Sequence, residues 1–304
     1  MALSIQSNMA SMSIQNQLGR SNDSLSTALE RLGSGFKINS AKDDAAGLQI
    51  ASRLNAQVRG QDAALYNSNN AMSMMQTAEG AFDEMTNIAY RMKELATQAA
   101  NGTNGDDEYV AISSEYVALT AELNSIMDNT SFGGTKLFNA DAAAAADKGK
   151  FATAVTFQVG SSTAETLAVD IGATLYVDGT ATDKSVQGTI NQLAVRASTG
   201  TPALAGGMDN RADAVAQLDF VDTLVSSIGT ARSALGASMN RLDHTMNNVT
   251  NMKENTQAAA STLMDADFAA ETSNMTKQQL LMNSGISVLS TANSTTQMIG
   301  SLLR

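Results

Sequence analysis

Hydrophobic residues in the first third of the chain recur at alternating steps of three and four. From residue 51 these steps reach, in order, Ala51, Leu54, Val58, Gln61, Leu65, Ser68, Met72, Met75, Ala78, Phe82, Met85, Ala89, Met92 and Ala96. Only Gln61 and Ser68 among them are polar. A sustained repeat averaging about 3.5 residues is typical of a coiled-coil seam. The pattern predicts one long helix that begins near Ser40, where Ser40 and Asp43 resemble a capping box.

Two further segments carry seams of the same kind. Gly105 and the acidic residues 106–108 predict a helix start, because negative charge is favourable at the positive end of a helix dipole. The second seam contains Tyr109, Ile112, Tyr116, Leu119, Leu123 and Ile126. The third contains Leu218, Val221, Val225, Ile228, Arg232, Leu235, Met239, Leu242, Met246 and Val249. The three helices predict one antiparallel bundle, and Gly33 and Gly35 predict the end of a helix before it.

The pattern changes from helical to alternating between the second and third helices. Residues 150–179 carry β-branched and aromatic residues interrupted by Gly, Ser and Thr, which predicts short strands and a hairpin. An alanine tract at 142–146 and the sequence around Pro202 flank this stretch. We therefore expect a mainly α fold, a long antiparallel helical bundle or coiled coil, with a small β-containing insert at 141–207.

Both ends of the chain lack charge. Residues 1–19 and 278–303 contain no Asp, Glu, Lys, Arg or His, although the formal net charge of the chain is −11. Both segments have helical spacing, and their polar faces carry amides and hydroxyls, which neighbouring polar groups can satisfy more easily than a buried charge. We predict that these faces are buried between copies of the chain, through Ile5, Met9, Met12, Leu18, Met282, Ile286, Leu289, Ile299, Leu302 and Leu303. An ordinary solvated helix or a loose tail is the alternative.

Composition and motifs argue against several other classes of protein. The pI near 4.5 and the lack of a basic stripe argue against nucleic-acid binding. No stretch approaches the roughly 18 apolar residues of a membrane helix, so membrane insertion is not expected, and the start does not resemble an ordinary signal peptide. The chain has no Cys and one His, His244, which we interpret as a solvated helical side chain. Without a P-loop, an EF-hand or an HExxH motif, we expect no enzyme, metal or cofactor.

Several longer segments point to a known family. They are LERLGSGFKINSAKDDAAGLQIASRL at 29–54, YRMKELATQAANGTN at 90–104, LGASMNRLDHTMNNV at 235–249, DFAAETSNMTKQQLL at 267–281 and the final SLLR. In order and spacing the chain resembles flagellin, the subunit of the bacterial flagellar filament, over about residues 1–140 and 208–304. Two alternatives stay open: a hook–filament junction protein, and a flagellin-like chain with an enzyme in its insert. The insert contains no His or Cys, which disfavours the second.

The resemblance implies an organisation and a set of partners. Residues 1–40 and 256–304 would form an inner helical domain, residues 41–140 and 208–255 a rod-like domain, and 141–207 an outer insert. The chain would polymerise with its own copies into an extracellular filament used for motility. It would be exported through the flagellum without a cleaved signal peptide. Its partners would be a chaperone on the C-terminal segment, a cap protein and hook-associated proteins.

The resemblance also implies a patch recognised by the animal Toll-like receptor 5. By motif this patch contains Arg91 and Leu95, with Glu115 from the following helix. Tyr90 and Thr97 stand where a common form of the motif has Gln and Val. A solvated helix face that also serves subunit packing explains the three residues equally well.

Overall fold

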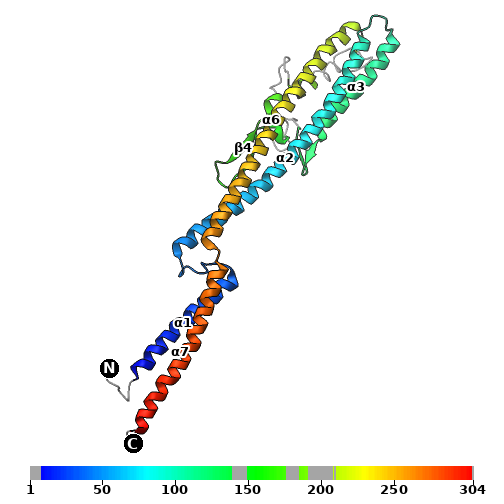
Figure 1. Cartoon of the computed structure of the whole chain (residues 1–304). Helices are drawn as coiled ribbons and strands as arrows, with labels where there is room; N and C mark the ends of the chain where they lie inside the picture. The colour runs from blue at the N-terminus through cyan, green and yellow to red at the C-terminus, as the bar shows by residue number, and fades with distance from the viewer. Residues whose placement is uncertain (1–7, 139–148, 176–184, 191–207, 209, 303–304) are drawn as a thin grey trace. The chain divides into compact units, whose positions relative to one another are not determined.

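The computed structural model describes residues 8–138, 149–175, 185–190, 208 and 210–302 (Figure 1). They divide into two compact parts: unit 1, Met1–Arg59 with Lys253–Arg304, and unit 2, Gly60–Met252. The long helices are α1 (Met9–Ser34), α2 (Ala45–Ala99), α3 (Asp106–Asn129), α6 (Arg211–Met264) and α7 (Phe268–Leu302). The remaining elements are β1 (Ser131–Phe132), β2 (Thr135–Lys136), η1 (Lys150–Ala152), β3 (Val155–Gln158), β4 (Thr166–Val169) and α4 (Gly172–Leu175). The expected mainly α fold with a small β-containing part is confirmed.

Unit 2 contains the predicted antiparallel bundle. The Lys93 ammonium pairs with Asp222, and Arg232 lies 2.7 Å from Glu79, so α6 runs antiparallel to α2. Every predicted seam position of α2, α3 and α6 is buried or half-buried, which confirms the three seams. The largest fully buried side chains of these helices are Tyr116, Phe82, Met75, Met85, Met92, Leu123 and Met127. The bundle therefore has a continuous core of methionine and aromatic side chains.

The start of α2 differs from the expectation. The Asp43 carboxylate accepts hydrogen bonds from the backbone N–H groups of Ser40 (2.9 Å) and Asn39 (3.2 Å) and from the Ser40 hydroxyl (3.0 Å). These bonds lower the pKa of Asp43, the Ser40 hydroxyl having the largest effect. The Asp43 N–H donates to the Ser40 carbonyl at 3.1 Å, so residues 40–43 form a turn. The bond from the Ser40 N–H to Asp43 is one that a capping box requires, but no helix starts there, and the prediction that these residues cap the long helix is wrong. The helix starts at Ala45, where Asp44 accepts a hydrogen bond of 2.9 Å from the Gly47 N–H.

The ends of α1 and α6 meet in a short extended contact within unit 1. Gly35 ends α1 with φ 77°, a left-handed conformation that favours glycine, whereas Gly33 lies inside the helix. The Lys37 N–H donates to the Met264 carbonyl at 2.6 Å, and the Ala266 N–H donates to the Gly35 carbonyl at 2.9 Å. These two bonds connect the chain leaving α1 to the segment between α6 and α7.

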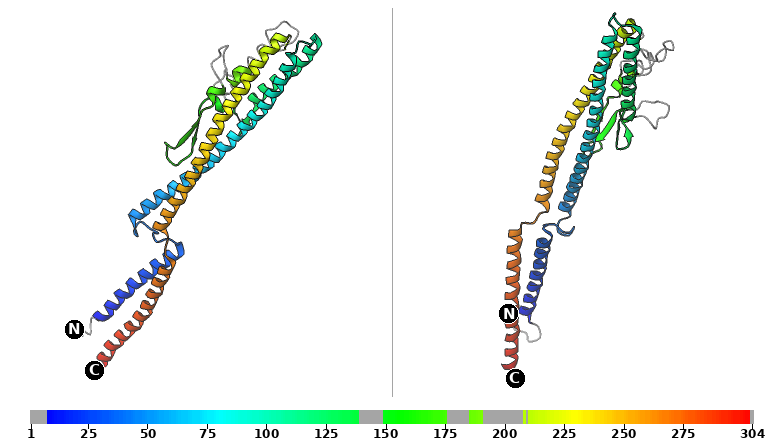
Figure 2. Two further views of the ribbon diagram at one scale, coloured as in Figure 1. Left: turned by 45° about the horizontal axis from the view of Figure 1, so that its top comes forward. Right: turned by 90° about the vertical axis from the view of Figure 1, so that its right-hand side faces the viewer.

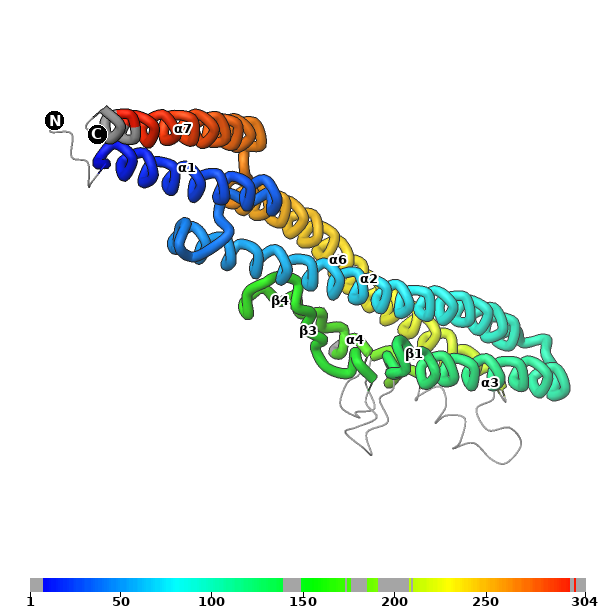
Figure 3. Tube along the Cα trace, turned by 90° about the horizontal axis from the view of Figure 1, so that it is seen from below, coloured from blue at the N-terminus to red at the C-terminus, as the bar shows by residue number. Residues whose placement is uncertain are grey.

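The predicted hairpin is present and packs on the bundle. β3 and β4 pair antiparallel from Val155↔Val169 to Gln158↔Thr166, and they lie along α2 in Figure 3. Two further strands, β1 and β2, enclose a turn at Gly133 and Gly134 and were not predicted from the sequence. The core of unit 2 includes Phe138, Phe151, Leu167, Val169, Ile171 and Leu175. The described part of the insert therefore shares one core with the helices. The alanine tract 142–146 and Pro202 lie outside the described residues.

We predict that unit 2 loses stability at alkaline pH through Tyr116. Its side chain is fully buried, its hydroxyl lies 3.3 Å from Gln217 Oε1, and burial raises its pKa above the ordinary value of 10.0. From about pH 10 upward the unfolded chain ionises this tyrosine and the folded chain does not. The free energy of unfolding should then fall by up to about 1.4 kcal/mol per pH unit.

Tyr116→Phe tests this assignment by urea unfolding of unit 2 at pH 7 and pH 11. At pH 7 the variant should be less stable by about 1 kcal/mol, because it loses the hydrogen bond to Gln217. At pH 11 the difference in the free energy of unfolding between the variant and the parent should shrink or reverse. Tyr66→Phe, at an exposed tyrosine of α2, is the control and should leave the pH dependence unchanged. If the free energy of unfolding changed equally with pH in Tyr116→Phe and the parent, the assignment would be contradicted.

Candidate functional site

The two terminal helices pack against each other along their length in unit 1. The Asn8 amide donates to the Ala292 carbonyl at 3.1 Å, and Arg31 pairs with Glu271 at 3.0 Å, so α1 and α7 run antiparallel (Figure 2). A Cβ added at Gly285 would lie 2.7 Å from Leu18 Cδ2. Glycine at 285 therefore permits the close approach of the two helices.

This helix pair leaves many large apolar side chains exposed, although Leu18, Met282 and Leu289 are half-buried. The buried residues of α1 are Ser11, Ser21 and Ala28. The exposed large side chains of the pair are Met9, Met12, Leu29, Phe268, Leu280, Leu281, Ile286, Val288 and Met298, and Met9 and Leu280 are 70% and 64% exposed. A helix of a globular protein normally turns its large apolar side chains toward a core. The pair is thus incomplete in a single chain.

The residues predicted for self-assembly fall into three groups. Met9, Met12 and Ile286 are exposed, and Leu18, Met282 and Leu289 are half-buried. The other predicted positions lie outside the described residues or have side chains that the structure does not describe: Ile5, Ile299, Leu302 and Leu303. The structure thus brings six predicted residues onto the α1–α7 pair.

The same surface contains residues that were not predicted from the sequence. Phe268 and Leu280 line an open hollow on α7, together with Thr272, Thr276 and Lys277. Residues 268, 272, 276 and 280 are spaced four apart and therefore share one helix face. This spacing is the sequence signal that could have identified the hollow. Because the two middle positions, Thr272 and Thr276, are polar, the pattern does not stand out as an apolar one.

A second surface lies on unit 2 and contains the predicted receptor patch. The Arg91 guanidinium lies 2.7 Å from Glu115 Oε1 on α3 and 3.0 Å from Glu94 Oε2 on its own helix. These carboxylates, Glu115 first, hold the pKa of Arg91 above its usual range. Leu95 is only 2% exposed and belongs to the core. The structure therefore joins Arg91 and Glu115 at the surface and places Leu95 in the interior.

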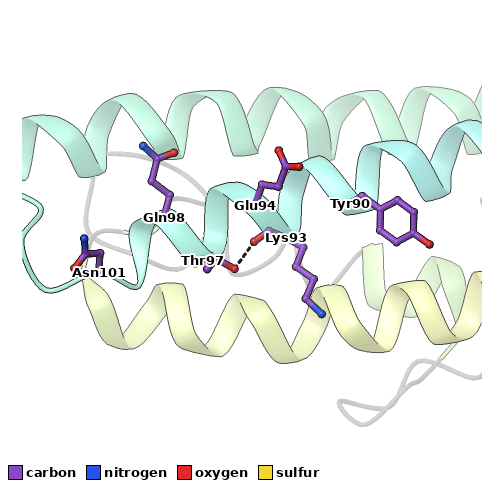
Figure 4. A pocket seen from close by; sticks show the side chains of 6 residues that line it. All are labelled: Tyr90, Lys93, Glu94, Thr97, Gln98 and Asn101. Carbon is purple, nitrogen blue, oxygen red and sulfur yellow. Dashed lines mark hydrogen bonds between the residues drawn. The ribbon is translucent and has the colours of Figure 1, made fainter.

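An open hollow on α2 borders this patch (Figure 4). It is lined by Tyr90, Lys93, Glu94, Thr97, Gln98 and Asn101. The Thr97 hydroxyl donates to the Lys93 carbonyl of its own helix at 2.8 Å, and Lys93 pairs with Asp222 on α6. The described part of the chain holds no cluster of three or more His, Cys, Asp or Glu able to bind a metal ion, and His244 is exposed. Nothing in this hollow resembles a catalytic site.

Long helices, and the many large apolar side chains exposed on the terminal pair, are typical of a structural protein that contacts other chains. Comparison with known sequences identifies the family. The profile of the bacterial flagellin N-terminal helical region matches residues 5–144, and that of the C-terminal helical region matches residues 218–303. The chain belongs to the flagellin family and is a structural subunit of a bacterial flagellar filament, not an enzyme.

Relatives support this membership over the full length. Flagellin D of Vibrio cholerae is 35% identical, covering 96% of this chain and 97% of the relative. Flagellin D of Vibrio anguillarum is 34% identical, covering 100% of both chains. The first alignment spans 377 positions, more than the 304 residues here, so that relative has residues without a counterpart in this chain.

A solved structure supports the fold. A protein of Vibrio parahaemolyticus, described as a flagellar hook-associated protein, has a TM-score of 0.57 at 17% identity, covering 73% of this chain and 99% of the other. At that identity the likeness shows the fold alone, so the junction-protein alternative is weaker than the flagellin assignment. Among the described residues, no helix combines the length and hydrophobicity required to span a bilayer.

Proposed function

We propose that this subunit polymerises by burying the outward faces of α1 and α7 against the same helices of neighbouring copies. The observation that carries this proposal is the set of large apolar side chains that the described part of the pair leaves exposed. Fully burying one Leu, Ile, Val, Met or Phe contributes roughly 1.5–3 kcal/mol. Association costs about 4–15 kcal/mol in lost freedom. Several such side chains per subunit are therefore needed, and this surface supplies them.

The charge distribution supports the same interface. Lys277 is the last charged residue before Arg304, so the outward face of α7 beyond it carries amides and hydroxyls between its apolar side chains. Burying an unpaired charge at a repeated contact would cost several kcal/mol. Thr291 and Thr295 instead donate to carbonyls of their own helix. Such a face can be enclosed by copies of itself without leaving charges unpaired.

Electron microscopy of the purified chain tests the proposal directly. The sample is imaged alone and after addition of sheared filament fragments as seeds. We expect the fragments to elongate with added chain. Fragments that stay at their original length would refute assembly through these helices. If such fragments nevertheless bound the chain at their ends, the result would favour the junction-protein alternative.

The same surface accounts for the proposed export partners. We infer that a chaperone covers residues 278–303 before export without a cleaved signal peptide, because an exposed apolar surface of this kind promotes aggregation. Outside the cell, a cap protein and hook-associated proteins would contact the ends of the growing filament. The exposed apolar side chains of α7 support a chaperone on the C-terminal segment.

We further propose that Arg91 and Glu115 form a contact surface for Toll-like receptor 5, with Leu95 holding α2 in place from the interior. Truncating a central interface arginine often costs 2 kcal/mol or more. Arg91→Ala should therefore weaken receptor activation by more than about tenfold. Because Arg91 is exposed, its loss should hardly change the unfolding midpoint.

A reporter assay on cells expressing the receptor measures this effect. Lys93→Ala is the matched control, because Lys93 lies on the same helix and pairs instead with Asp222 on α6. We expect the control to activate the receptor like the parent. Equal activation by Arg91→Ala and the parent would exclude the patch as the receptor contact.

A further inference from the structure

The methionines of this chain are divided by exposure. Of its 17 methionines all but Met1 lie in the described residues. The exposed ones are Met9, Met12 and Met298, and all three lie on α1 or α7. Fully buried methionines lie in the core of unit 2, at Met75, Met85, Met92, Met127 and Met208. A solvent oxidant therefore meets thioethers first on the terminal helix pair.

Hydrogen peroxide oxidises an exposed thioether without help from any other group. A sulfur lone pair attacks one peroxide oxygen, the S–O bond forms as the O–O bond breaks, and the other oxygen leaves as water after proton transfer. Sulfur is oxidised by two electrons and peroxide is reduced by two. The product, methionine sulfoxide, is polar and chiral, and methionine sulfoxide reductases return it to the thioether at the expense of a thiol.

We propose that Met9, Met12 and Met298 are oxidation sites through which peroxide reversibly prevents the free subunit from joining a filament. This inference rests on the proposed function, because it requires that the outward faces of α1 and α7 become buried. A sulfoxide oxygen loses its water there, and an unsatisfied polar group in an apolar contact is unfavourable. The folded core is spared, because its methionines are closed to solvent.

The position of each methionine makes the effect specific to assembly. Met9 and Met12 lie in the first turn of α1, and Met298 lies in the last turns of α7. The Asn8 amide contacts the Ala292 carbonyl at this end of the pair, so α1 begins beside the last turns of α7. Oxidation thus concentrates polar groups at one end of the helix pair.

Graded peroxide treatment of the purified subunit, followed by seeded elongation, tests the inference. Sulfoxide at each methionine is measured by peptide mass spectrometry, in the pelleted filaments and in the unassembled fraction. Oxidation should lower the apparent affinity for filament ends by at least about tenfold, a change equivalent to about 1.4 kcal/mol. Oxidised Met9, Met12 and Met298 should be depleted from the pellet. Treatment with sulfoxide reductases for both epimers should restore elongation.

Two triple variants provide the controls. Met9→Leu, Met12→Leu and Met298→Leu together conserve volume approximately and should keep elongation after peroxide. Met72→Leu, Met239→Leu and Met246→Leu, at half-buried positions of unit 2, should leave the sensitivity unchanged.

The possible outcomes distinguish a failure of the oxidation proposal from a failure of the proposed function. Equal sulfoxide content at the three sites in pellet and supernatant, or equal loss of elongation in the first variant and the parent, would overturn this proposal alone. Failure of the untreated parent to elongate seeds would overturn the proposed function and this proposal with it.

Discussion

Removal of residues 278–304 is expected to abolish polymerisation and to leave unit 2 folded. The deletion takes away most of α7, including Leu280, Ile286, Val288 and Met298 from the exposed apolar face. It also uncovers the side of α1 that packs on Gly285 and Ala292. The core of unit 2 lies within residues 60–252 and contains none of the deleted residues. Loss of assembly should therefore occur without loss of the bundle.

Circular dichroism melting and seeded electron microscopy measure the two expected results. Ile286→Asp and Ile286→Leu form a matched pair at full length. The charged variant should block elongation, because an unpaired buried carboxylate costs several kcal/mol, and the leucine variant should elongate normally. Filaments of ordinary length from the truncated chain would refute the role of α7, and an unfolded unit 2 would contradict the division into units.

The helical seams were predictable because they depend only on a local period. Alternating steps of three and four place each position on the same helix face, whichever helix it meets. The one charged position of the third seam, Arg232, is half-buried because Glu79 and Asp83 on α2 both reach it, at 2.7 and 3.2 Å. Sequence alone could not identify those partners, because they depend on the register between two distant helices.

Other features depend on contacts that no local pattern contains. Leu95 lies one position before the seam residue Ala96, and it is buried because α2 packs against both α3 and α6, which widens its buried stripe. Asp43 accepts the bond from the Ser40 N–H that a capping box requires, but α2 starts only at Ala45, so the two residues cap a turn and not the helix. Predicting either feature would have required knowledge of how the chain folds in three dimensions.

For the surface of the α1–α7 pair, burial between copies could be proposed from the sequence, but the orientation of the helices could not be predicted. The absence of charge in 1–19 and 278–303 indicated burial between copies, and the exposed positions of Met9, Met12 and Ile286 in the single chain fit that interpretation. The orientation of the pair was not predictable. It depends on contacts between segments far apart in the sequence, such as Leu18 beside Gly285 and the ion pair between Arg31 and Glu271.

Phe138→Ala is expected to destabilise unit 2 by about 3–5 kcal/mol, the usual range for truncating a buried phenylalanine. The Phe138 ring is fully buried, 4.8 Å from the Phe82 ring of α2 and 6.1 Å from the Phe151 ring of η1. It therefore connects the helical bundle to the insert. Domains of this kind are stable by only about 5–15 kcal/mol, so the variant should lose a large share of its stability.

Urea unfolding followed by circular dichroism measures this change, since α2, α3 and α6 dominate the signal of unit 2. Phe268→Ala, at an exposed phenylalanine of α7, is the control and should shift the free energy of unfolding by no more than about 0.5 kcal/mol. A loss below about 1 kcal/mol for Phe138→Ala would show that the insert and the bundle are stabilised separately. A loss in the expected range means that the described part of the insert belongs to the core of unit 2, and that changing its inner side chains weakens the subunit.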